Sequence, residues 1–126
     1  MSIKENMKIW KVGLLVEDVK VAEDFYVGIL GMEIVSRSPL GSLLLNAGGI
    51  NLEIIPRKIF EGDERLGKPG VHHLSFKVED MKGTTEELKA RGVKFIKEPF
   101  EIRPGVTLAF FDGLNHINLQ LFGQKK

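Results

Sequence analysis

The 126-residue sequence contains no cysteine, which excludes disulfide bonds, cysteine-ligated zinc sites and a thiol nucleophile. It also has almost no excess of charge: the formal net charge of +1 gives no electrostatic reason to expect nucleic-acid or membrane binding. No apolar run approaches the roughly 20 residues that cross a bilayer. The first eight residues are polar and charged and lack the apolar stretch of a secretory signal. We therefore expect a cytoplasmic protein.

Apolar residues, by contrast, are plentiful. They make up 43% of the chain, which is enough for a protein of this length to bury a core without a covalent or metal staple. We therefore expect residues 1–126 to form a single domain.

The first half of the chain predicts one strand, one helix and three further strands. Residues 10–16 read WKVGLLV, a short run rich in apolar and β-branched residues. Asp18 then occupies a helix N-cap position, apolar residues recur at helical spacing as far as Leu30, and Gly31 falls where a helix ends. Three strand-like runs follow, at residues 32–38, 42–47 and 50–55. Hairpin turns at residues 39–41 and 48–49 separate them.

The second half repeats this order. Residues 71–78 predict a strand, Asp80 is placed to cap a helix that runs to Ala90, and Gly92 terminates that helix. The following strands are predicted at residues 93–102, 106–111 and 117–122. Between the halves, residues 57–70 are interrupted by proline and glycine and show no sustained apolar period, which is typical of a linker.

The repetition extends to the residues themselves. The segment KVGLLVEDVK at 11–20 aligns with HLSFKVEDMK at 73–82, and INLEII at 50–55 aligns with INLQLF at 117–122. An internal repeat of this length decides the fold prediction. We predict an α+β fold made of two βαβββ units, repeat 1 over about residues 8–56 and repeat 2 over about residues 71–122.

These features resemble the glyoxalase/vicinal-oxygen-chelate superfamily over nearly the whole chain. The resemblance is carried by the strand followed by Val-Glu-Asp, by Phe25-Tyr26 before Leu30-Gly31-Met32, and by the terminal Ile-Asn-Leu-Gln-Leu. In pattern the chain is most similar to glyoxalase I and methylmalonyl-CoA epimerase. The resemblance implies two curved, antiparallel-rich half-barrels around a cavity, built within one chain or across a dimer. It does not fix the reaction, because this fold hosts lyases, epimerases, dioxygenases and drug-sequestering proteins.

Strand alternation assigns side chains to the two faces of each predicted sheet. The apolar sets that should pack under the helices are Val12, Leu14, Val16, Leu52 and Ile54 in repeat 1, and Leu74, Phe76, Val78, Leu119 and Leu121 in repeat 2. The opposite faces then carry, at repeat-equivalent positions, Lys11, Glu53, His73 and Gln120. Metal-dependent members of the superfamily hold their ligands at these positions. The resemblance therefore implies Glu53, His73 and Gln120 as ligands of a divalent metal such as Ni, Zn, Mn or Co.

Lys11 departs from that ligand pattern. A lysine coordinates a metal only as the neutral amine, and removing its proton at neutral pH costs on the order of 4–5 kcal/mol. A protonated Lys11 should instead lie within salt-bridge reach of Glu53 and replace the metal cation. His116 shares the strand parity of Gln120 and is a further ligand candidate. The His, His, Glu set of extradiol dioxygenases is not matched, because Lys and Gln occupy two of its three positions.

Each candidate residue also has an ordinary structural explanation. Glu53 fits an exposed charge on a half-buried strand, and Gln120 fits a polar group that satisfies its neighbours. His72 and His73 are adjacent, so alternation should turn one of them outward. The functional interpretation is favoured because the candidate residues coincide at repeat-equivalent positions.

Two functions from different classes fit these residues. The first is a lyase or isomerase that moves a proton next to a carbonyl through an enolate or enediolate, with Glu53 as the base and either a metal or Lys11 stabilising the oxyanion. The alternative is a metal-free protein that sequesters a small molecule, resembling bleomycin-resistance proteins. A dimer with a vestigial cavity is a third hypothesis. In each case the βαβββ units leave sheet edges to cover, so we predict a homodimer.

Overall fold

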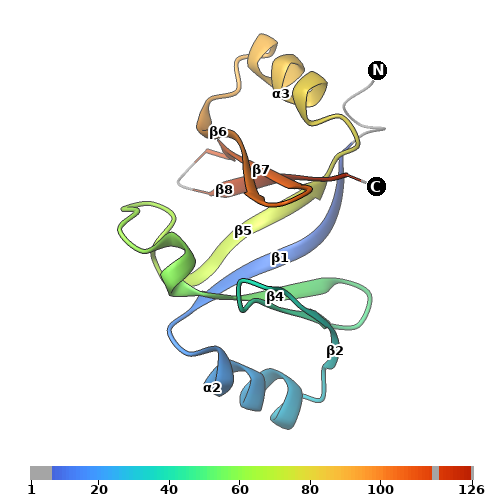
Figure 1. The fold of residues 1–126 in the computed structure, drawn as a ribbon, viewed down its shortest axis with the longest axis vertical. Coiled ribbons are helices and arrows are strands. Elements are labelled where there is room, and N and C mark those ends of the chain that lie inside the picture. The colour runs from blue at the N-terminus through green and yellow to red at the C-terminus, as the bar shows by residue number, and fades with distance from the viewer. Residues whose placement is uncertain (1–6, 115–116, 126) are drawn as a thin grey trace. The chain divides into compact units, whose positions relative to one another are not determined.

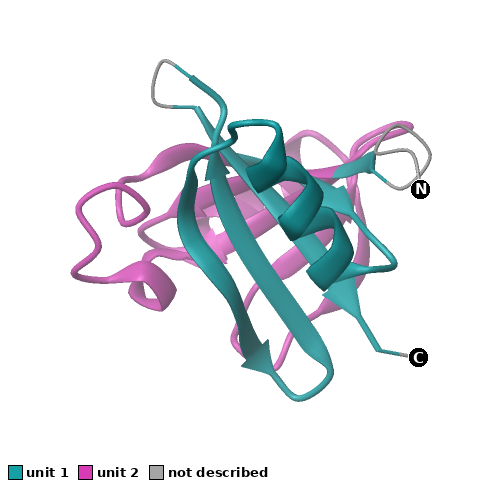
Figure 2. Cartoon of the chain, turned by 90° about the horizontal axis from the view of Figure 1, so that it is seen from above, with its two compact units in different colours: residues 1–10, 73–126 teal, residues 11–72 magenta. Residues whose placement is uncertain are grey.

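The computed structural model describes residues 7–114 and 117–125 and divides into two compact units, which Figure 2 distinguishes by colour. Unit 1 comprises residues 1–10 and 73–126, and unit 2 comprises residues 11–72. Both units contain a helix that follows their first strand and a four-stranded set of neighbouring strands, so the predicted α+β arrangement of two βαβββ units is confirmed. Within the described ranges, every helix is too short or too polar to cross a membrane.

Unit 2 follows the order predicted for repeat 1 (Figure 1). Its elements are the greater part of β1 (Lys8–Val16), α2 (Val19–Glu23), the helical segment η1 (Asp24–Ile29), β2 (Glu33–Arg37), β3 (Leu43–Asn46), β4 (Asn51–Pro56) and the 3₁₀ turn η2 (Arg57–Phe60). The strands lie in the order β2-β3-β4-β1. β1 runs parallel to β4, whereas β2–β3 and β3–β4 are antiparallel. This register positions the candidate residues of β1 and β4 on neighbouring strands.

The helix of unit 2 begins where the sequence predicts. The Asp18 carboxylate accepts hydrogen bonds from the backbone N–H of Lys20 at 2.9 Å and of Val21 at 3.2 Å. Two of the amides that a helix start leaves without a partner are thereby satisfied. The helical segment gives way at Gly31, whose φ of 77° suits a residue without a side chain.

The second part of this helix differs from the regular α-helix that the spacing predicts. Over Asp24–Ile29 it widens into π-helical turns, and the N–H of Leu30 donates to the carbonyl of Phe25 at 3.0 Å. Packing divides the apolar residues accordingly: Val19, Ala22, Tyr26 and Val27 contact the core, whereas Val21, Phe25, Ile29 and Leu30 are exposed. Apolar spacing does not reveal a π turn, because such a turn is defined by backbone hydrogen-bond partners and not by side-chain type.

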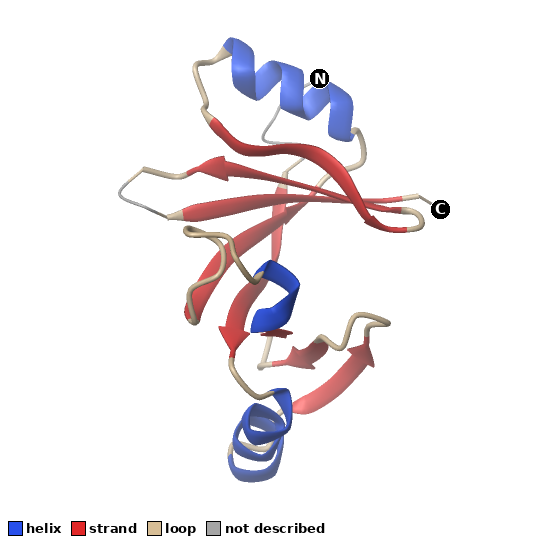
Figure 3. Cartoon of the chain, turned by 60° about the vertical axis from the view of Figure 1, so that its left-hand side comes forward, coloured by secondary structure: helices blue, strands red, loops and turns tan. Residues whose placement is uncertain are grey.

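Unit 1 repeats the topology. Its elements are most of β5 (Gly70–Lys77), α3 (Met81–Ala90), β6 (Phe95–Arg103), β7 (Val106–Asp112) and β8 (Asn118–Gln124), in the strand order β5-β8-β7-β6. β5 is parallel to β8, and the other neighbours are antiparallel. Asp80 caps α3 by accepting from the N–H of Gly83 at 2.9 Å, and α3 lies across the strands of its unit (Figure 3). The predicted caps of both helices are therefore confirmed.

Each unit has its own core on the helix-facing side of its strands. In unit 2 the cluster contains Ala22, Leu43, Leu45 and Ile54, with Leu14, Val16 and Leu52 packed against it. In unit 1 it contains Val78, Leu88, Ala109, Phe111 and Leu121, with Phe76 and Leu119 packed against it. These residues have the parity that strand alternation predicts, so the faces that carry the candidate functional residues are also assigned correctly.

The segment between the repeats, residues 57–70, is folded rather than extended. Leu66 is fully buried, and its N–H donates to the Asp63 carboxylate at 2.8 Å. The Arg57 guanidinium donates through Nε to the carbonyl of Gly67 at 3.1 Å. The segment thus has one apolar anchor and its own polar contacts.

Candidate functional site

In unit 2, Lys11 and Glu53 form a buried ion pair. Lys11 Nζ lies 2.8 Å from Glu53 Oε1, and the two side chains are 4% and 19% exposed. The salt-bridge contact predicted from alternation and repeat position is confirmed. A charge-assisted hydrogen bond of this length is among the stronger polar contacts in proteins, and partial exclusion of water strengthens it further.

The register of β1 and β4 explains how the two side chains meet. Gly13 is the residue of β1 that lies opposite Glu53, and Lys11 lies opposite Asn51. Gly13 has no side chain, so the residue directly across from Glu53 offers it no polar group. Lys11 lies two residues before Gly13 on β1, and its long side chain reaches the Glu53 carboxylate. Burying a lysine in this way requires an anionic partner, and Glu53 provides it.

In unit 1, the equivalent positions form a different polar chain. Ser75 lies opposite Gln120 on β8, and its hydroxyl donates to Gln120 Oε1 at 2.6 Å. The indole N–H of Trp10 donates to the Ser75 hydroxyl oxygen at 3.1 Å. Ser75 is fully buried and Gln120 is 2% exposed. Strand alternation turns Ser75 to the same face as His73, and in the repeat alignment Ser75 takes the place of Gly13. That substitution was the sequence signal that could have marked Ser75 as a functional residue.

His73 is buried in unit 1. It is 2% exposed, and its ring meets the ring of Phe110 edge-on at 5.6 Å between centroids. The neighbouring His72, in unit 2, is 3% exposed. The prediction that one of these two histidines points outward is therefore wrong. Alternation turns them to opposite faces, but the folded segment 57–70 covers the face on which His72 lies.

His72 is held by that segment. Its Nε2 donates to the carbonyl of Leu66 at 2.5 Å, and its ring packs on Phe60 with 4.6 Å between centroids. Burial lowers the pKa of His72 below its ordinary value of 6.5, while the bond to Leu66 and the charges of Asp63 and Glu53 act in the opposite direction. His72 is thus a neutral, structural histidine near neutral pH.

Two of the oxygens predicted to hold a divalent cation already accept hydrogen bonds. The Lys11 ammonium occupies Oε1 of Glu53, and a hydroxyl hydrogen points at Oε1 of Gln120. Among residues 7–114 and 117–125, no three His, Asp or Glu side chains are grouped to hold a metal. His116 lies outside the described residues. The joint metal site of Glu53, His73 and Gln120 stays a prediction.

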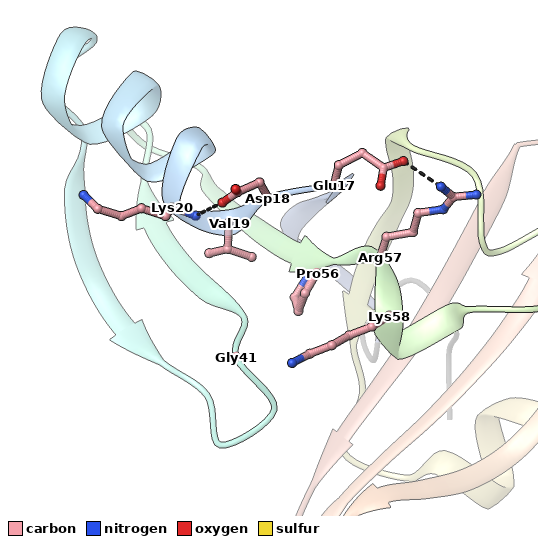
Figure 4. Close-up of a pocket in the computed structure, with 8 residues that line it drawn as sticks. All are labelled: Glu17, Asp18, Val19, Lys20, Gly41, Pro56, Arg57 and Lys58. Atoms are coloured by element: carbon pink, nitrogen blue, oxygen red, sulfur yellow. Dashed lines mark hydrogen bonds and ion pairs between the residues drawn. The ribbon is translucent and has the colours of Figure 1, made fainter.

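Unit 2 also has a surface cavity of about 360 Å³. It is lined by Glu17, Asp18, Val19, Lys20, Gly41, Pro56, Arg57 and Lys58 (Figure 4). Two of its charges cancel, because Arg57 Nη1 bonds Glu17 Oε1 at 2.6 Å, and Asp18 is engaged as the helix cap. Neither Lys11 nor Glu53 lines this cavity. Glu17 and Arg57 therefore satisfy each other's charges within the cavity.

Comparison with known proteins places these observations in a family context. The model of a family described as "Glyoxalase/Bleomycin resistance protein/Dioxygenase superfamily" matches residues 8–121. Two proteins of Bacillus subtilis (strain 168) are similar over most of their length. "Uncharacterized protein YetH" is 29% identical over 111 residues, 83% of this chain and 89% of its own. "Uncharacterized protein YraH" is 27% identical over 125 residues, 92% of this chain and 98% of its own.

Solved structures with the same fold include epimerases. A hypothetical protein from Bacillus halodurans C-125 has a TM-score of 0.77 at 20% identity, covering 95% of this chain and 96% of its own. Methylmalonyl-CoA epimerase from Mycobacterium tuberculosis has a TM-score of 0.70 at 18% identity, covering 96% and 89%. A variant of the Streptomyces coelicolor epimerase in complex with 2-nitronate-propionyl-CoA has a TM-score of 0.74 at 18% identity, covering 96% and 99%. At these identities the likeness shows the fold alone.

Proposed function

The chain belongs to the Glyoxalase/Bleomycin resistance protein/Dioxygenase superfamily, and from this premise we propose that it is a small-molecule enzyme of the lyase or isomerase type. In this proposal Glu53 removes a proton next to a carbonyl group, and Lys11 stabilises the enolate or enediolate that forms. The observation that carries the proposal is the buried contact of 2.8 Å between Lys11 Nζ and Glu53 Oε1.

The charge balance of the pair suits proton transfer. Before the reaction the ammonium of Lys11 neutralises the carboxylate of Glu53. When the carboxylate takes the substrate proton, it becomes neutral and the negative charge moves to the substrate oxygen. The ammonium has three N–H groups, so it can bond both oxygens and follow that charge. The net charge of the site is unchanged throughout, which limits the electrostatic cost of forming an oxyanion away from water.

The unequal burial of the two side chains fits their proposed roles. Lys11 is the more buried partner at 4% exposure, so its charge is fixed and weakly screened. Glu53 keeps 19% of its surface exposed, which leaves part of the carboxylate accessible to a ligand. Its Oε1 contacts the ammonium, and we assign Oε2 to the substrate proton. A productive substrate places its carbonyl oxygen near Nζ and its acidic carbon near Oε2.

A metal-assisted route is the first alternative form of the same chemistry. It would use Glu53, His73 and Gln120, with Ni, Zn, Mn or Co polarising the carbonyl oxygen. We favour the lysine route because the ammonium already occupies the carboxylate to which the metal would bind.

A second candidate function is sequestration of a small molecule without catalysis. The observation in its favour is the substitution of lysine for a ligand of the metal-dependent relatives. A site that has lost its metal can keep a cavity and bind, as the resemblance to bleomycin-resistance proteins implies. We further propose a cytoplasmic homodimer that acts on a small-molecule ligand and on neither nucleic acid nor membrane.

Exchange of carbon-bound protons with solvent tests the proposed function. The purified protein is incubated in D₂O with 2-oxo acids, α-hydroxy ketones and acyl-CoA thioesters, and loss of the proton next to the carbonyl is followed by NMR. We expect exchange of at least one class that persists in EDTA. Glu53→Gln and Lys11→Met should each slow it by about 100-fold or more. Glu33→Gln and Lys58→Met, which change exposed residues of the same unit, serve as matched controls.

The other outcomes separate the alternatives. Exchange that EDTA abolishes and that Ni, Zn, Mn or Co restores would replace the lysine route by the metal route. Saturable binding of these compounds without exchange would contradict the enzyme and support sequestration.

A further inference from the structure

We infer that Gln120 is a hydrogen-bond donor to a carbonyl or carboxylate oxygen of a small-molecule ligand, because the Ser75 hydroxyl engages its amide oxygen and leaves the amide nitrogen to donate. The site lies in unit 1, on the face of β5 and β8 opposite the one that packs under α3. This inference goes beyond the proposed proton transfer and does not depend on it. It assigns a new role to a position at which metal-dependent relatives carry a ligand.

The structure places the carbonyl oxygen of Gln120, and not its nitrogen, 2.6 Å from the Ser75 hydroxyl. An indole N–H donates and never accepts, so the Ser75 hydroxyl oxygen is the acceptor of the 3.1 Å bond from Trp10. In this orientation the hydroxyl hydrogen has an acceptor in Gln120 Oε1. A reversed amide would donate to the hydroxyl oxygen and leave the hydroxyl hydrogen to find another partner.

The fixed carbonyl leaves the Nε2 end of Gln120 with two hydrogens to donate. Gln120 is 2% exposed, and within the described part of the chain the bond from Ser75 is its one side-chain hydrogen bond. The Nε2 atom itself is not fully buried, so it is open to an acceptor from outside the chain. A metal is not a suitable partner, because an amide nitrogen presents hydrogens and no available lone pair. An oxygen atom of a carbonyl or carboxylate group can accept these hydrogens and is a suitable partner.

The repeat-equivalent residue supports the assignment by contrast. Glu53, the counterpart of Gln120 in unit 2, is acceptor-only when ionised and bonds a cation. Gln120 has the same length and the same place in the register, but it offers a neutral donor. The chain thus carries an acceptor in unit 2 and a donor in unit 1 at repeat-equivalent positions.

Side-chain amide NMR tests this inference with acetate and Mn²⁺ as probes. In ¹⁵N-labelled protein, the Gln120 Nε2 signals are identified as the pair that disappears in Gln120→Glu. We expect acetate to move this pair downfield in a saturable manner and Mn²⁺ to leave it sharp. Absence of an acetate effect, or broadening of the pair by substoichiometric Mn²⁺, would overturn the donor assignment.

The Gln120→Glu variant distinguishes a hydrogen-bond donor from a metal ligand, because the two roles predict different changes in acetate and Mn²⁺ affinity. It keeps an acceptor for the Ser75 hydroxyl and is therefore expected to fold. A donor role predicts that acetate affinity falls by about tenfold or more, because an N–H is replaced by a carboxylate oxygen. A metal-ligand role predicts instead that Mn²⁺ affinity is kept or raised. Gln124→Glu, the same change at the exposed end of β8, is the matched control and should leave both affinities unchanged.

Trp10→Phe tests the positioning role of the indole N–H. The phenyl ring can keep an aromatic contact with Phe122, whose ring centroid lies 4.9 Å from that of Trp10, whereas the N–H donor is lost and the contact of Lys77 Nζ with the ring at 5.1 Å is weakened. The Ser75 hydroxyl can then turn, and the amide of Gln120 is no longer held in one direction. We expect acetate affinity to fall by about threefold to tenfold and the two Nε2 hydrogens to exchange faster with solvent. An unchanged acetate affinity with a folded protein would remove Trp10 and Ser75 from the inference.

Discussion

Units 2 and 1 share one backbone register and differ in the side chains that face each other across it. In unit 2, Gly13 lies opposite Glu53, and the carboxylate receives an ammonium from Lys11, two residues away. In unit 1, Ser75 lies opposite Gln120, and the amide oxygen receives the hydroxyl hydrogen from directly across the strands. The comparison shows that the residue opposite Glu53 or Gln120 on the parallel neighbouring strand decides which donor that side chain meets. A glycine admits a distant cation, and a serine supplies a local neutral donor.

The largest expected effect on stability comes from breaking the ion pair of unit 2. Lys11→Met leaves the largely buried Glu53 carboxylate without its cation, and we expect the free energy of unfolding to fall by about 2–4 kcal/mol. Urea denaturation at neutral pH measures it. The double variant Lys11→Met, Glu53→Met should recover most of that loss, because a buried pair replaced by apolar side chains is close to neutral. Additive losses would show that the two side chains do not stabilise one another.

Removing the neutral hydrogen bonds of unit 1 should lower the stability by a smaller amount. Ser75→Ala removes the donor to Gln120 and the acceptor of the indole N–H, and we expect a loss of about 1–3 kcal/mol. Trp10→Phe removes one of these bonds and should cost about 1 kcal/mol. Chemical denaturation of the two variants under identical conditions gives the ratio of their losses in unfolding free energy. A larger loss for Trp10→Phe than for Ser75→Ala would contradict the order of the chain.

A pH titration sharpens the comparison through His72. Its pKa is lowered by burial, so the unfolded chain takes up a proton near the ordinary value of 6.5 and the folded chain does so only at lower pH. The free energy of unfolding should therefore decrease as pH falls from 6.5 towards the lowered pKa, by up to about 1.4 kcal/mol per pH unit. His72→Phe, which can still pack on Phe60, should flatten this part of the curve. A curve of the same slope in that variant would assign the pH dependence to other groups.

The helix caps give the smallest expected difference between the units. Asp18 accepts two backbone N–H groups, whereas Asp80 accepts one. Each change to alanine should cost about 1 kcal/mol, and Asp18→Ala should cost more than Asp80→Ala. Thermal denaturation of the single variants measures both. The reverse order would mean that the second bond at Asp18, 3.2 Å long, contributes nothing.

Much of the fold could be predicted from the sequence because its signals are local. The caps, the helix-ending glycines and the hairpin turns mark the element boundaries, and the internal repeat fixes their order. The faces of the strands follow from alternation, and so does the contact between Lys11 and Glu53. These inferences need only the neighbours along the chain and a repeat to align.

Other features depend on contacts that the sequence does not announce. The π turns of η1 depend on backbone hydrogen bonds that span more residues than those of an α-helix, and Phe25 is exposed although its spacing is helical. His72 is buried because residues 57–70 fold over it, and a segment rich in charge and glycine gave no sign of that. The Ser75 hydroxyl that bonds Gln120 also accepts from Trp10, which comes from a different strand.

The central claim, that the Lys11 ammonium takes the place of a metal cation on Glu53, is tested most directly by calorimetric metal titration. Wild type and Lys11→His are titrated with Ni, Zn, Mn and Co salts under identical conditions. The account predicts no stoichiometric binding by the wild type and clear binding by Lys11→His, with the largest gain at or above neutral pH, where the imidazole is unprotonated. Tight binding by the wild type, or equal affinities for the two proteins, would contradict it.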